Sequence, residues 1–335
     1  MNHTPSPTPV RWGILSTAKI AREKIIPALR ESARHEIVAI ASRSAEAARA
    51  AAERFGIPVA HGSYAALIAD PAVEAVYNPL PNHLHVPLTL AALQAGKHVL
   101  CEKPFAISAA ELETLRPHAT RLHFREAFMV RHHPQWHAAR EHVRAGEIGS
   151  LRSVQVAFSY FNDDPANVRN VLAMGGGGLY DIGCYAILAG RWFFEAAPQR
   201  VVAMLDTDPV FRVDRLASAL LDFGAGRQLV FSVGTQSFRH QRVQLIGTRG
   251  RIEIEMPFNP VEGATSRYAI QTADSAALHT VMVPAANQYA LLCDAFADAV
   301  RFEAPSAAAL DDALINARVI EAVFASAKGG RVEVL

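Results

Sequence analysis

The first hundred residues alternate short apolar runs with helical patterns, and this alternation restricts the possible folds more than any other feature. The apolar runs have the length of buried strands and cover residues 10–15, 36–41, 73–77 and 99–101. Helical segments are expected at residues 45–55, 64–68 and 86–95, and Gly56 and Gly96 follow two of them as C-terminal caps. We therefore predict an α/β fold in which a doubly wound parallel sheet carries helices on both faces.

A short turn joins the first strand to a helix that runs toward Arg30. In a dinucleotide site this turn reads G-x-G-x-x-G, because small residues let the backbone approach a pyrophosphate at the helix N-terminus. Ser16, Ala18 and Ala21 occupy the three glycine positions here, so all are small but none is glycine. An ordinary strand-to-helix turn explains the pattern about equally well, although Ser16 and Thr17 also carry hydroxyls that can donate to phosphate oxygens.

The second strand ends in Ser42-Arg43-Ser44, which bears on the choice of cofactor. Most NAD sites place a carboxylate near this point to accept from the ribose 2′-hydroxyl, and none stands here. Arginine between two serines suits a 2′-phosphate, because a guanidinium binds phosphate through parallel hydrogen bonds. Ser44 also has the position of an N-cap for the next helix, and the two interpretations are compatible. We favour NADP over NAD.

The stretch His98 to Phe105 reads His-Val-Leu-Cys-Glu-Lys-Pro-Phe. Glu102 and Lys103 follow the apolar run at its carboxyl end, the edge at which open α/β sheets bind ligands. Pro104 favours an extended backbone at Lys103. A lysine in this position is either a solvated loop residue or a catalytic cation. At the same edge, two prolines make the loop from Asn78 to His83 rigid.

Four consecutive glycines, Gly175 to Gly178, stand before Leu-Tyr-Asp-Ile-Gly-Cys-Tyr. Glycines let the chain pass close to a ligand before a helix starts. If the helix begins near Gly178, Asp181 and Tyr185 lie on one face. A bare glycine loop with a core tyrosine explains the spacing equally well. A tyrosine acid/base needs a nearby cation, since a free phenol titrates near pH ~10, and Lys103 is the candidate.

From Leu151 the pattern changes to strands that alternate apolar and polar residues. They are expected at residues 152–161, 200–205, 217–223, 228–235, 242–247 and 250–255. Such a run predicts a large open, mainly antiparallel sheet with one face on helices and the other free. Two amphipathic helices, near residues 287–301 and 307–328, finish the chain. A length of 335 residues is typical of two domains.

Composition excludes several classes. A net charge of +1 without a long basic block argues against a nucleic-acid or membrane-surface partner. Three widely spaced cysteines form no disulfide or zinc pattern. His133 and His137 have a spacing that can bind metal on a helix, but no H-E-x-x-H motif accompanies them, and we expect no metal. Met1 to Pro9 is predicted to be a disordered tail, and Arg191 interrupts the apolar run at residues 182–194, so we expect a soluble, cytoplasmic protein.

Four stretches together resemble the family of glucose–fructose oxidoreductase and inositol dehydrogenase (Gfo/Idh/MocA). They are residues 12–18, 78–85, 96–104 and 175–185. Within this family the chain is similar to the branch of dihydrodiol dehydrogenase and NADP-dependent D-xylose dehydrogenase. The glycine-poor turn resembles that branch. So does Tyr185, where the wider family commonly has histidine.

The resemblance implies a Rossmann domain at residues 10–125 and an α+β domain at residues 126–335. The second domain is expected to bind substrate and to form a homodimer or higher homo-oligomer through the free face of its sheet. Catalytic roles are implied for Lys103, Tyr185 and Asp181, and substrate contacts for Arg131, His133, Asp181 and Tyr185. Cofactor contacts are expected from Ser16, Thr17, Ala18, Ile20, Ser42, Arg43, Ser44, Leu80, Pro81, Asn82, His85, Glu102 and Lys103.

These features lead to one main functional hypothesis. We predict an NAD(P)-dependent oxidoreductase that transfers a hydride between nicotinamide and a secondary alcohol or hemiacetal of a sugar or polyol. Tyr185 would move the hydroxyl proton with help from Lys103, while Asp181 orients the substrate or positions Lys103. Two alternatives stay open. One is a non-catalytic NADP-sensing regulator, which has no use for the lysine–tyrosine pair. The other is a glycoside-acting enzyme that uses bound NAD redox-neutrally.

Overall fold

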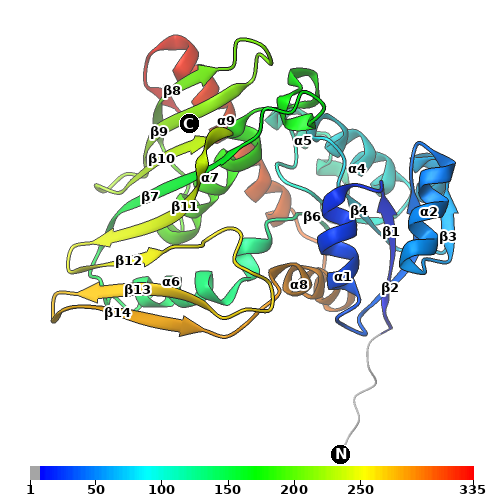
Figure 1. Ribbon diagram of the computed structural model, residues 1–335, viewed down its shortest axis with the longest axis horizontal. Helices are drawn as coiled ribbons and strands as arrows, with labels where there is room; N and C mark the ends of the chain where they lie inside the picture. The colour runs from blue at the N-terminus through cyan, green and yellow to red at the C-terminus, as the bar shows by residue number, and fades with distance from the viewer. Residues whose placement is uncertain (1–7) are drawn as a thin grey trace, which may run out of the picture. The chain divides into compact units, whose positions relative to one another are not determined.

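A computed structural model describes residues 8–335 and divides them into two compact units (Figure 1). Unit 1 contains the chain up to Ala106 with Ala110–Met129 and Asn287–Ala313. Unit 2 contains Ile107–Ala109, Val130–Ala286 and Leu314–Leu335. Of the predicted tail, residues 1–7 lie outside the described residues. The carbonyls of Thr8 and Pro9 accept hydrogen bonds from Arg301 at 2.8 and 3.0 Å, so this end of the predicted tail is held in place.

Unit 1 is built on a six-stranded parallel sheet with the order β3-β2-β1-β4-β5-β6. Its strands are β1 (Val10–Leu15), β2 (His35–Ala41), β3 (Val59–His61), β4 (Ala75–Asn78), β5 (His98–Cys101) and β6 (Phe124–Glu126). Its helices are α1 (Ile26–Leu29), α2 (Ala45–Phe55), α3 (Tyr64–Ala69), α4 (His85–Gln94), the short α5 (Ala109–Glu113) and α8 (Gln288–Phe302). The predicted doubly wound sheet is confirmed, since the chain winds one way from β1 to β3 and the other way from β4 to β6.

Local sequence explains where several of these elements end. Ser44 caps α2 by accepting a hydrogen bond from Ala47 N, and Gly56 closes it in the left-handed conformation with φ 54°. Strand β6 ends at Glu126, because a 3₁₀ turn at Met129–His132 follows. Strand β3 was not predicted, and its three residues carry little periodic signal.

Helix α8 belongs to unit 1, although it lies inside the range 126–335 expected for the second domain. Its ring contact between Phe296 and Trp12 has a centroid distance of 5.4 Å. Arg301 binds both carboxylate oxygens of Glu74, at 2.6 and 2.7 Å. These apolar and ionic contacts return the chain to the first unit, so the domain boundary is not a single point in the sequence.

Unit 2 is built on a nine-stranded sheet with the order β14-β13-β12-β11-β7-β10-β9-β8-β15. The strands are β7 (Leu151–Phe161), β8 (Arg200–Thr207), β9 (Asp214–Asp222), β10 (Gln228–Gly234), β11 (Gln236–Gly247), β12 (Gly250–Ile254), β13 (Ser266–Thr272), β14 (Ser275–Val283) and β15 (Glu333–Val334). The pair β7–β10 is parallel and the other described pairs are antiparallel. The predicted mainly antiparallel sheet is thus confirmed, with β13, β14 and β15 in addition.

The two faces of this sheet differ in burial because side chains alternate along each strand. One row of cross-strand neighbours is buried from β8 to β13 and consists of Val201, Leu221, Leu229, Val154, Leu245, Ile252 and Ile270. The adjacent row on the other face contains Val202, Leu220 and Val230, which are 39%, 36% and 42% exposed. Part of the open face is therefore apolar.

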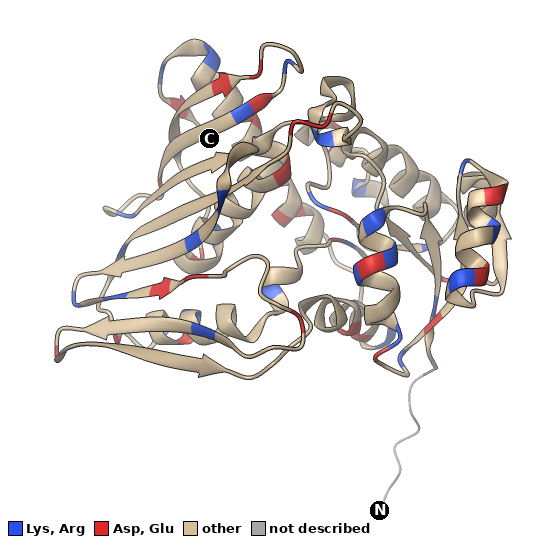
Figure 2. Ribbon diagram, viewed as in Figure 1, with Lys and Arg blue, Asp and Glu red and all other residues tan. Residues whose placement is uncertain are grey.

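Helices α6 (Pro134–Arg144), α7 (Cys184–Phe194) and α9 (Ala308–Gly329) accompany the sheet. Gly190 lets α7 approach it closely, because a Cβ there would lie 2.9 Å from Leu229 Cδ2. The segment Leu172–Phe194 is long and apolar enough to cross a membrane, but 67% of its most apolar stretch is buried within the fold. Such burial is typical of a core helix. Basic and acidic residues are scattered over both units (Figure 2).

Candidate active site

The predicted cofactor residues of unit 1 follow four strands of the parallel sheet. Because parallel strands end at one edge, the segments after β1, β2, β4 and β5 share that edge. The chain leaves neighbouring β1 and β4 in opposite directions, which makes the space between them the switch point of the sheet. The residues concerned are Ser16, Thr17, Ala18 and Ile20 after β1, Ser42, Arg43 and Ser44 after β2, Leu80, Pro81 and Asn82 after β4, and Glu102 and Lys103 after β5.

The turn after β1 keeps a glycine-like backbone without a glycine. Ser16 has φ 92°, a conformation that favours glycine, and its N–H donates to Ala41 O at 2.9 Å. Arg22 Nε donates to Thr17 O at 2.9 Å and fixes the turn from the helix side. Among the residues that the structure describes, no side chain caps the following π-helical turn Ala21–Ile25. This arrangement fits a dinucleotide pyrophosphate, which binds backbone N–H groups at a helix N-terminus.

The segment after β2 combines a helix cap with an exposed cation. Ser44 Oγ accepts from Ala47 N at 3.2 Å, and Ser42 Oγ accepts from Ser44 N at 3.2 Å. The N-cap interpretation of Ser44 is therefore confirmed. Arg43, between the two serines, is exposed, and its predicted contact with a 2′-phosphate stays a prediction.

Lys103 follows a residue that is fixed by several hydrogen bonds. Glu102 N donates to Asn78 O at 3.0 Å, so the end of β5 is tied to the end of β4. Tyr77 OH donates to Glu102 Oε1 at 2.7 Å, and Lys103 N donates to Oε2 at 3.3 Å. Burial, and then the negative charge of Glu102, raise the pKa of Tyr77. The carboxylate predicted to contact the cofactor is thus an internal anchor for the backbone at Lys103.

The ring of His85 is held by the protein's own backbone, and its predicted contact with the cofactor stays a prediction. Its ring is fully buried, with Nδ1 2.7 Å from Pro104 O and Nε2 2.7 Å from Leu80 O. Both ring nitrogens face carbonyl oxygens of the protein. Burial lowers the pKa of His85 to about 4, whereas the two carbonyls favour the charged ring. His85 holds the loop after β4 against the loop that carries Lys103.

In unit 2, Asp181 lies in a π-helical turn, Leu179–Gly183, that leads into α7. Asp181 Oδ2 accepts from Tyr160 OH at 2.6 Å and pairs with Arg169 Nε at 2.9 Å. Tyr185, one turn further on, is buried near the rings of Phe158 and Phe258, at centroid distances of 6.0 and 5.5 Å. Asp181 and Tyr185 therefore share one local structure in which Asp181 is already ion-paired.

Two of these residues, Tyr160 and Arg169, were missed in the sequence. The Asp181 carboxylate raises the pKa of Arg169, and the neighbouring Tyr185 acts in the same direction. Burial, followed by the charge of Asp181, raises the pKa of Tyr160. Arg169 stands in the irregular stretch between β7 and the glycines, where no periodic pattern marked it. Arg169 and Asp181 are also too far apart in the sequence for a helix or strand spacing to link them.

Two of the four glycines, Gly176 and Gly177, let the protein's own chain pass closely. A Cβ on Gly176 would lie 2.5 Å from Arg169 O, and Gly177 N donates to the same oxygen at 2.9 Å. Gly177 has φ 122° and packs against Asp214, whose Oδ2 accepts from Leu179 N at 2.6 Å. The packing gives a reason within the protein for these two glycines, and the approach of a ligand to the loop stays a prediction. The loop fixes the backbone at Arg169 and the start of the helix that carries Asp181.

The remaining predicted substrate residues lie at the start of α6. Arg131 is in the 3₁₀ turn before this helix. His133 is buried and caps α6, because its Nδ1 accepts from Gln135 N at 3.2 Å. Burial, and then His137, lower the pKa of His133 to about 4. The neutral ring of His133 caps α6, and this role suits it better than a contact with substrate. Residues 8–335 contain no group of three or more His, Cys, Asp or Glu side chains that could hold a metal ion.

Comparisons with known proteins agree with this architecture. Residues 10–132 match the oxidoreductase family with a NAD-binding Rossmann fold, and residues 136–253 match the GFO/IDH/MocA C-terminal domain. An uncharacterized oxidoreductase, ORF334, of Rhizobium meliloti is 45% identical over 97% of this chain and 98% of its own. D-xylose 1-dehydrogenase (NADP(+)) 2 of Haloferax volcanii is 37% identical over 95% and 98%. A crystal structure of a 3-ketoreductase from Actinomadura kijaniata with NADP and TDP-benzene superposes with a TM-score of 0.89, at 32% identity over 95% and 98% of the chains.

Proposed function

Because this chain belongs to the GFO/IDH/MocA oxidoreductase family, we propose that it is an NADP-dependent oxidoreductase acting on an alcohol or hemiacetal group of a sugar or related polyol. The observation that carries the proposal is the position of Lys103 directly after β5, at the edge of the sheet that the predicted cofactor residues share. That edge is where open α/β sheets bind their ligands.

In this proposal the cofactor is held by backbone groups and one cation. The turn at Ser16, Thr17 and Ala18 binds the pyrophosphate, and Arg43 binds the ribose 2′-phosphate. The relatives support NADP, since the Haloferax enzyme is named for it and the Actinomadura enzyme was crystallised with it. When bound, the nicotinamide accepts the hydride in oxidation and donates it in reduction.

Proton transfer is assigned to Tyr185 with Lys103 as its partner. Removing a hydride from an alcohol carbon requires that the hydroxyl proton leave, and Tyr185 accepts it in oxidation and returns it in reduction. The Lys103 ammonium favours the phenolate form and polarises the substrate oxygen. Asp181 positions the tyrosine helix and orients Arg169 beside it. The Actinomadura ketoreductase was also solved with one tyrosine changed to phenylalanine and with one lysine changed to alanine or glutamate.

Reduction of NADP measured across a panel of aldoses and polyols tests this function. We expect turnover with at least one sugar in the wild type, a loss of kcat of about 100-fold or more in Tyr185→Phe, since general acid–base catalysis contributes ~10²–10⁴-fold, and a similar loss in Lys103→Met. Undiminished turnover in either variant would remove that residue from the mechanism. Cleavage of a glycoside without net cofactor change would favour the redox-neutral alternative.

The open face of the unit 2 sheet supports self-association as part of this proposal. Val202, Leu220 and Val230 are neighbours across β8, β9 and β10, and Met204 on β8 is 80% exposed. An apolar stripe of this kind is typical of an interface. We expect a homodimer in sedimentation analysis and a shift toward monomer in Leu220→Glu. A monomeric wild type would contradict the proposed self-association through this face.

A further inference from the structure

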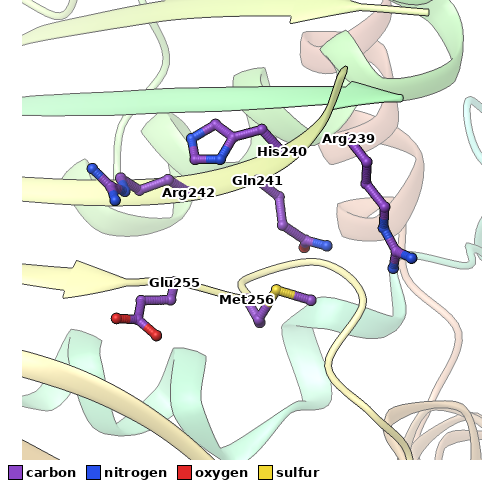
Figure 3. Close-up of a pocket in the computed structure, with 6 residues that line it drawn as sticks. All are labelled: Arg239, His240, Gln241, Arg242, Glu255 and Met256. Carbon is purple, nitrogen blue, oxygen red and sulfur yellow. The ribbon is translucent and has the colours of Figure 1, made fainter. Parts of the chain in front are cut away.

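A pocket of ≈ 290 Å³ lies in unit 2 where β11 and β12 separate (Figure 3). Pairing between these strands begins at Val243 and Ile254, so the pocket walls lie beyond the last pair. It is lined by Arg239, His240, Gln241, Arg242, Glu255 and Met256. None of these residues was predicted from the sequence to take part in cofactor binding or catalysis.

A bulge in β11 presents one wall of the pocket. Gln236 stands opposite Phe161 of β7, whereas His240 stands opposite Ser159. β11 therefore advances by four residues where β7 advances by two. The extra residues turn outward, and Phe238 is 92% exposed while its carbonyl accepts from Ser159 Oγ at 2.6 Å. Bulges commonly redirect side chains beside functional sites. Here the bulge delivers Arg239 to the pocket.

Gln241 supplies an oriented donor beside this arginine. Its side chain is buried, and its Oε1 accepts from Phe258 N and Asn259 N, both at 3.0 Å. Two backbone donors identify that atom as the amide oxygen, so the NH₂ group is the end that turns away from them. Figure 3 shows the side chains of Gln241 and Arg239 extending from β11 to the same side, and both residues line the pocket. A guanidinium and an amide NH₂ therefore face one space.

The charges around the pocket leave it positive. The acidic residues nearest to it are matched by arginines, since Glu255 pairs with Arg267 at 3.2 Å and Glu253 pairs with Arg242 at 3.3 Å. Arg239 adds an exposed positive charge to these balanced pairs. A wall rich in donors with excess positive charge suits an oxyanion, and a planar guanidinium matches the geometry of phosphate.

We propose that this pocket binds the phosphate group of a phosphorylated or nucleotide-linked sugar, with Arg239 and the Gln241 amide as its donors. The sugar part of the assignment rests on the proposed function. The phosphate part rests on the pocket alone. The inference adds anionic sugars to the ligands that the protein is expected to bind.

Calorimetric titration of the full-length protein tests the proposal with glucose 1-phosphate, dTDP-glucose and inorganic phosphate as separate probes. We expect saturable binding of at least one sugar phosphate and weaker binding of inorganic phosphate. Arg239→Met and Gln241→Glu should each weaken that binding about tenfold or more, since one charge-assisted hydrogen bond is worth ~1.5–3 kcal/mol. Gln241→Glu keeps an oxygen for Phe258 N and Asn259 N but replaces the donor by a negative oxygen.

Arg251→Met is the matched control, because Arg251 is an exposed arginine of β12 whose Nε donates to Gln271 at 3.0 Å, outside the pocket. Its binding should match that of the wild type. The proposal is overturned if no probe binds at about 10 mM, if Arg239→Met binds like the wild type, or if inorganic phosphate binds as tightly as both sugar phosphates. Binding needs no turnover, so a protein without dehydrogenase activity that still passes this test would refute only the proposed function.

Discussion

Arg169 Nε lies 2.9 Å from Asp181 Oδ2, and Tyr160 OH donates to the same oxygen at 2.6 Å. Asp181 stands one helical turn before Tyr185, the proposed acid/base. Arg169 is fixed on its other side by the glycine loop, through the bond from Gly177 N to its carbonyl. Unit 2 thus places a cation, Arg169, and an anion, Asp181, near Tyr185. Their charges act on the phenol in addition to any effect of Lys103.

The first prediction concerns the charges around Tyr185. Arg169→Met is expected to raise the pH at which alcohol oxidation reaches half its maximum kcat/KM, because loss of the cation disfavours the phenolate. Asp181→Asn should move the same limb to lower pH, since it removes a negative charge. On the acid limb, a shift of about one pH unit lowers kcat/KM about tenfold for Arg169→Met and raises it about tenfold for Asp181→Asn. Full pH profiles of kcat/KM measure both effects.

Arg249→Met is the matched control for this pair of variants. Arg249 forms an exposed ion pair with Asp274 at 3.1 Å, with side chains 62% and 82% exposed, and such pairs contribute little. Its pH profile should follow that of the wild type. Shifts of the same sign in Arg169→Met and Asp181→Asn would contradict an electrostatic origin.

The second prediction concerns the glycine loop. Gly176→Ala should lower the free energy of unfolding by roughly 1–3 kcal/mol, because its Cβ would meet the carbonyl of Arg169 at 2.5 Å and backbone cannot easily move aside. Gly178→Ala is the control, since the nearest atoms to its Cβ are at 3.4 Å, an ordinary contact. Urea denaturation compares the two. Equal losses would mean that the close approach at Gly176 is not what requires glycine.

The sequence predicted the elements of the fold better than their long-range packing. Short apolar runs followed by helices were sufficient for the parallel sheet of unit 1, because each β-α unit is local. The sequence did not show that helix α8 packs with unit 1, since its contact with Trp12 joins residues far apart in the chain. A pattern of apolar residues shows that a helix has a buried face, but it does not show which surface covers that face.

The candidate site was predictable only where the fold itself brings residues to one edge. The residues after β1, β2, β4 and β5 share an edge because the strands are parallel. The sequence could not show what the ring of His85 contacts, because a histidine beside a loop looks the same whether its nitrogens face a ligand or carbonyls. Here both nitrogens face carbonyls. Four glycines indicated a close approach, but the sequence does not tell which atoms approach, and they are those of Arg169 and Asp214.

The third prediction concerns cofactor choice. Arg43→Leu should weaken NADP binding about tenfold or more while NAD binding changes little, because only NADP has a 2′-phosphate for the guanidinium. Arg49→Leu is the control, since Arg49 is an exposed arginine of α2 outside the segment that follows β2. Fluorescence titration with both nucleotides measures the ratio of the two dissociation constants. A parallel loss for NAD and NADP would mean that Arg43 does not read the 2′-phosphate.

The fourth prediction concerns Asp214, the buried carboxyl that caps the helix start at Leu179 N. Burial raises its pKa to about 7 from an ordinary value of 3.8. The folded protein therefore keeps this proton where the unfolded chain has lost it. The stabilisation is complete below pH ~4, falls as pH rises, and is gone above pH ~7, a change on the order of 4 kcal/mol at about 1.4 kcal/mol per pH unit.

Comparing Asp214→Asn with the wild type isolates this titration, because asparagine does not ionise. The wild type should lose stability relative to Asp214→Asn between pH 5 and pH 8 in urea denaturation. Asp222→Asn is a control of opposite sign, since the Arg200 guanidinium lowers the pKa of Asp222. The contribution of Asp222 to stability is therefore lost only when the pH falls toward that lowered value. The difference between wild type and Asp222→Asn should therefore stay constant from pH 5 to pH 8. If the Asp214→Asn difference is equally constant, Asp214 is ionised throughout this range and caps the helix as a carboxylate.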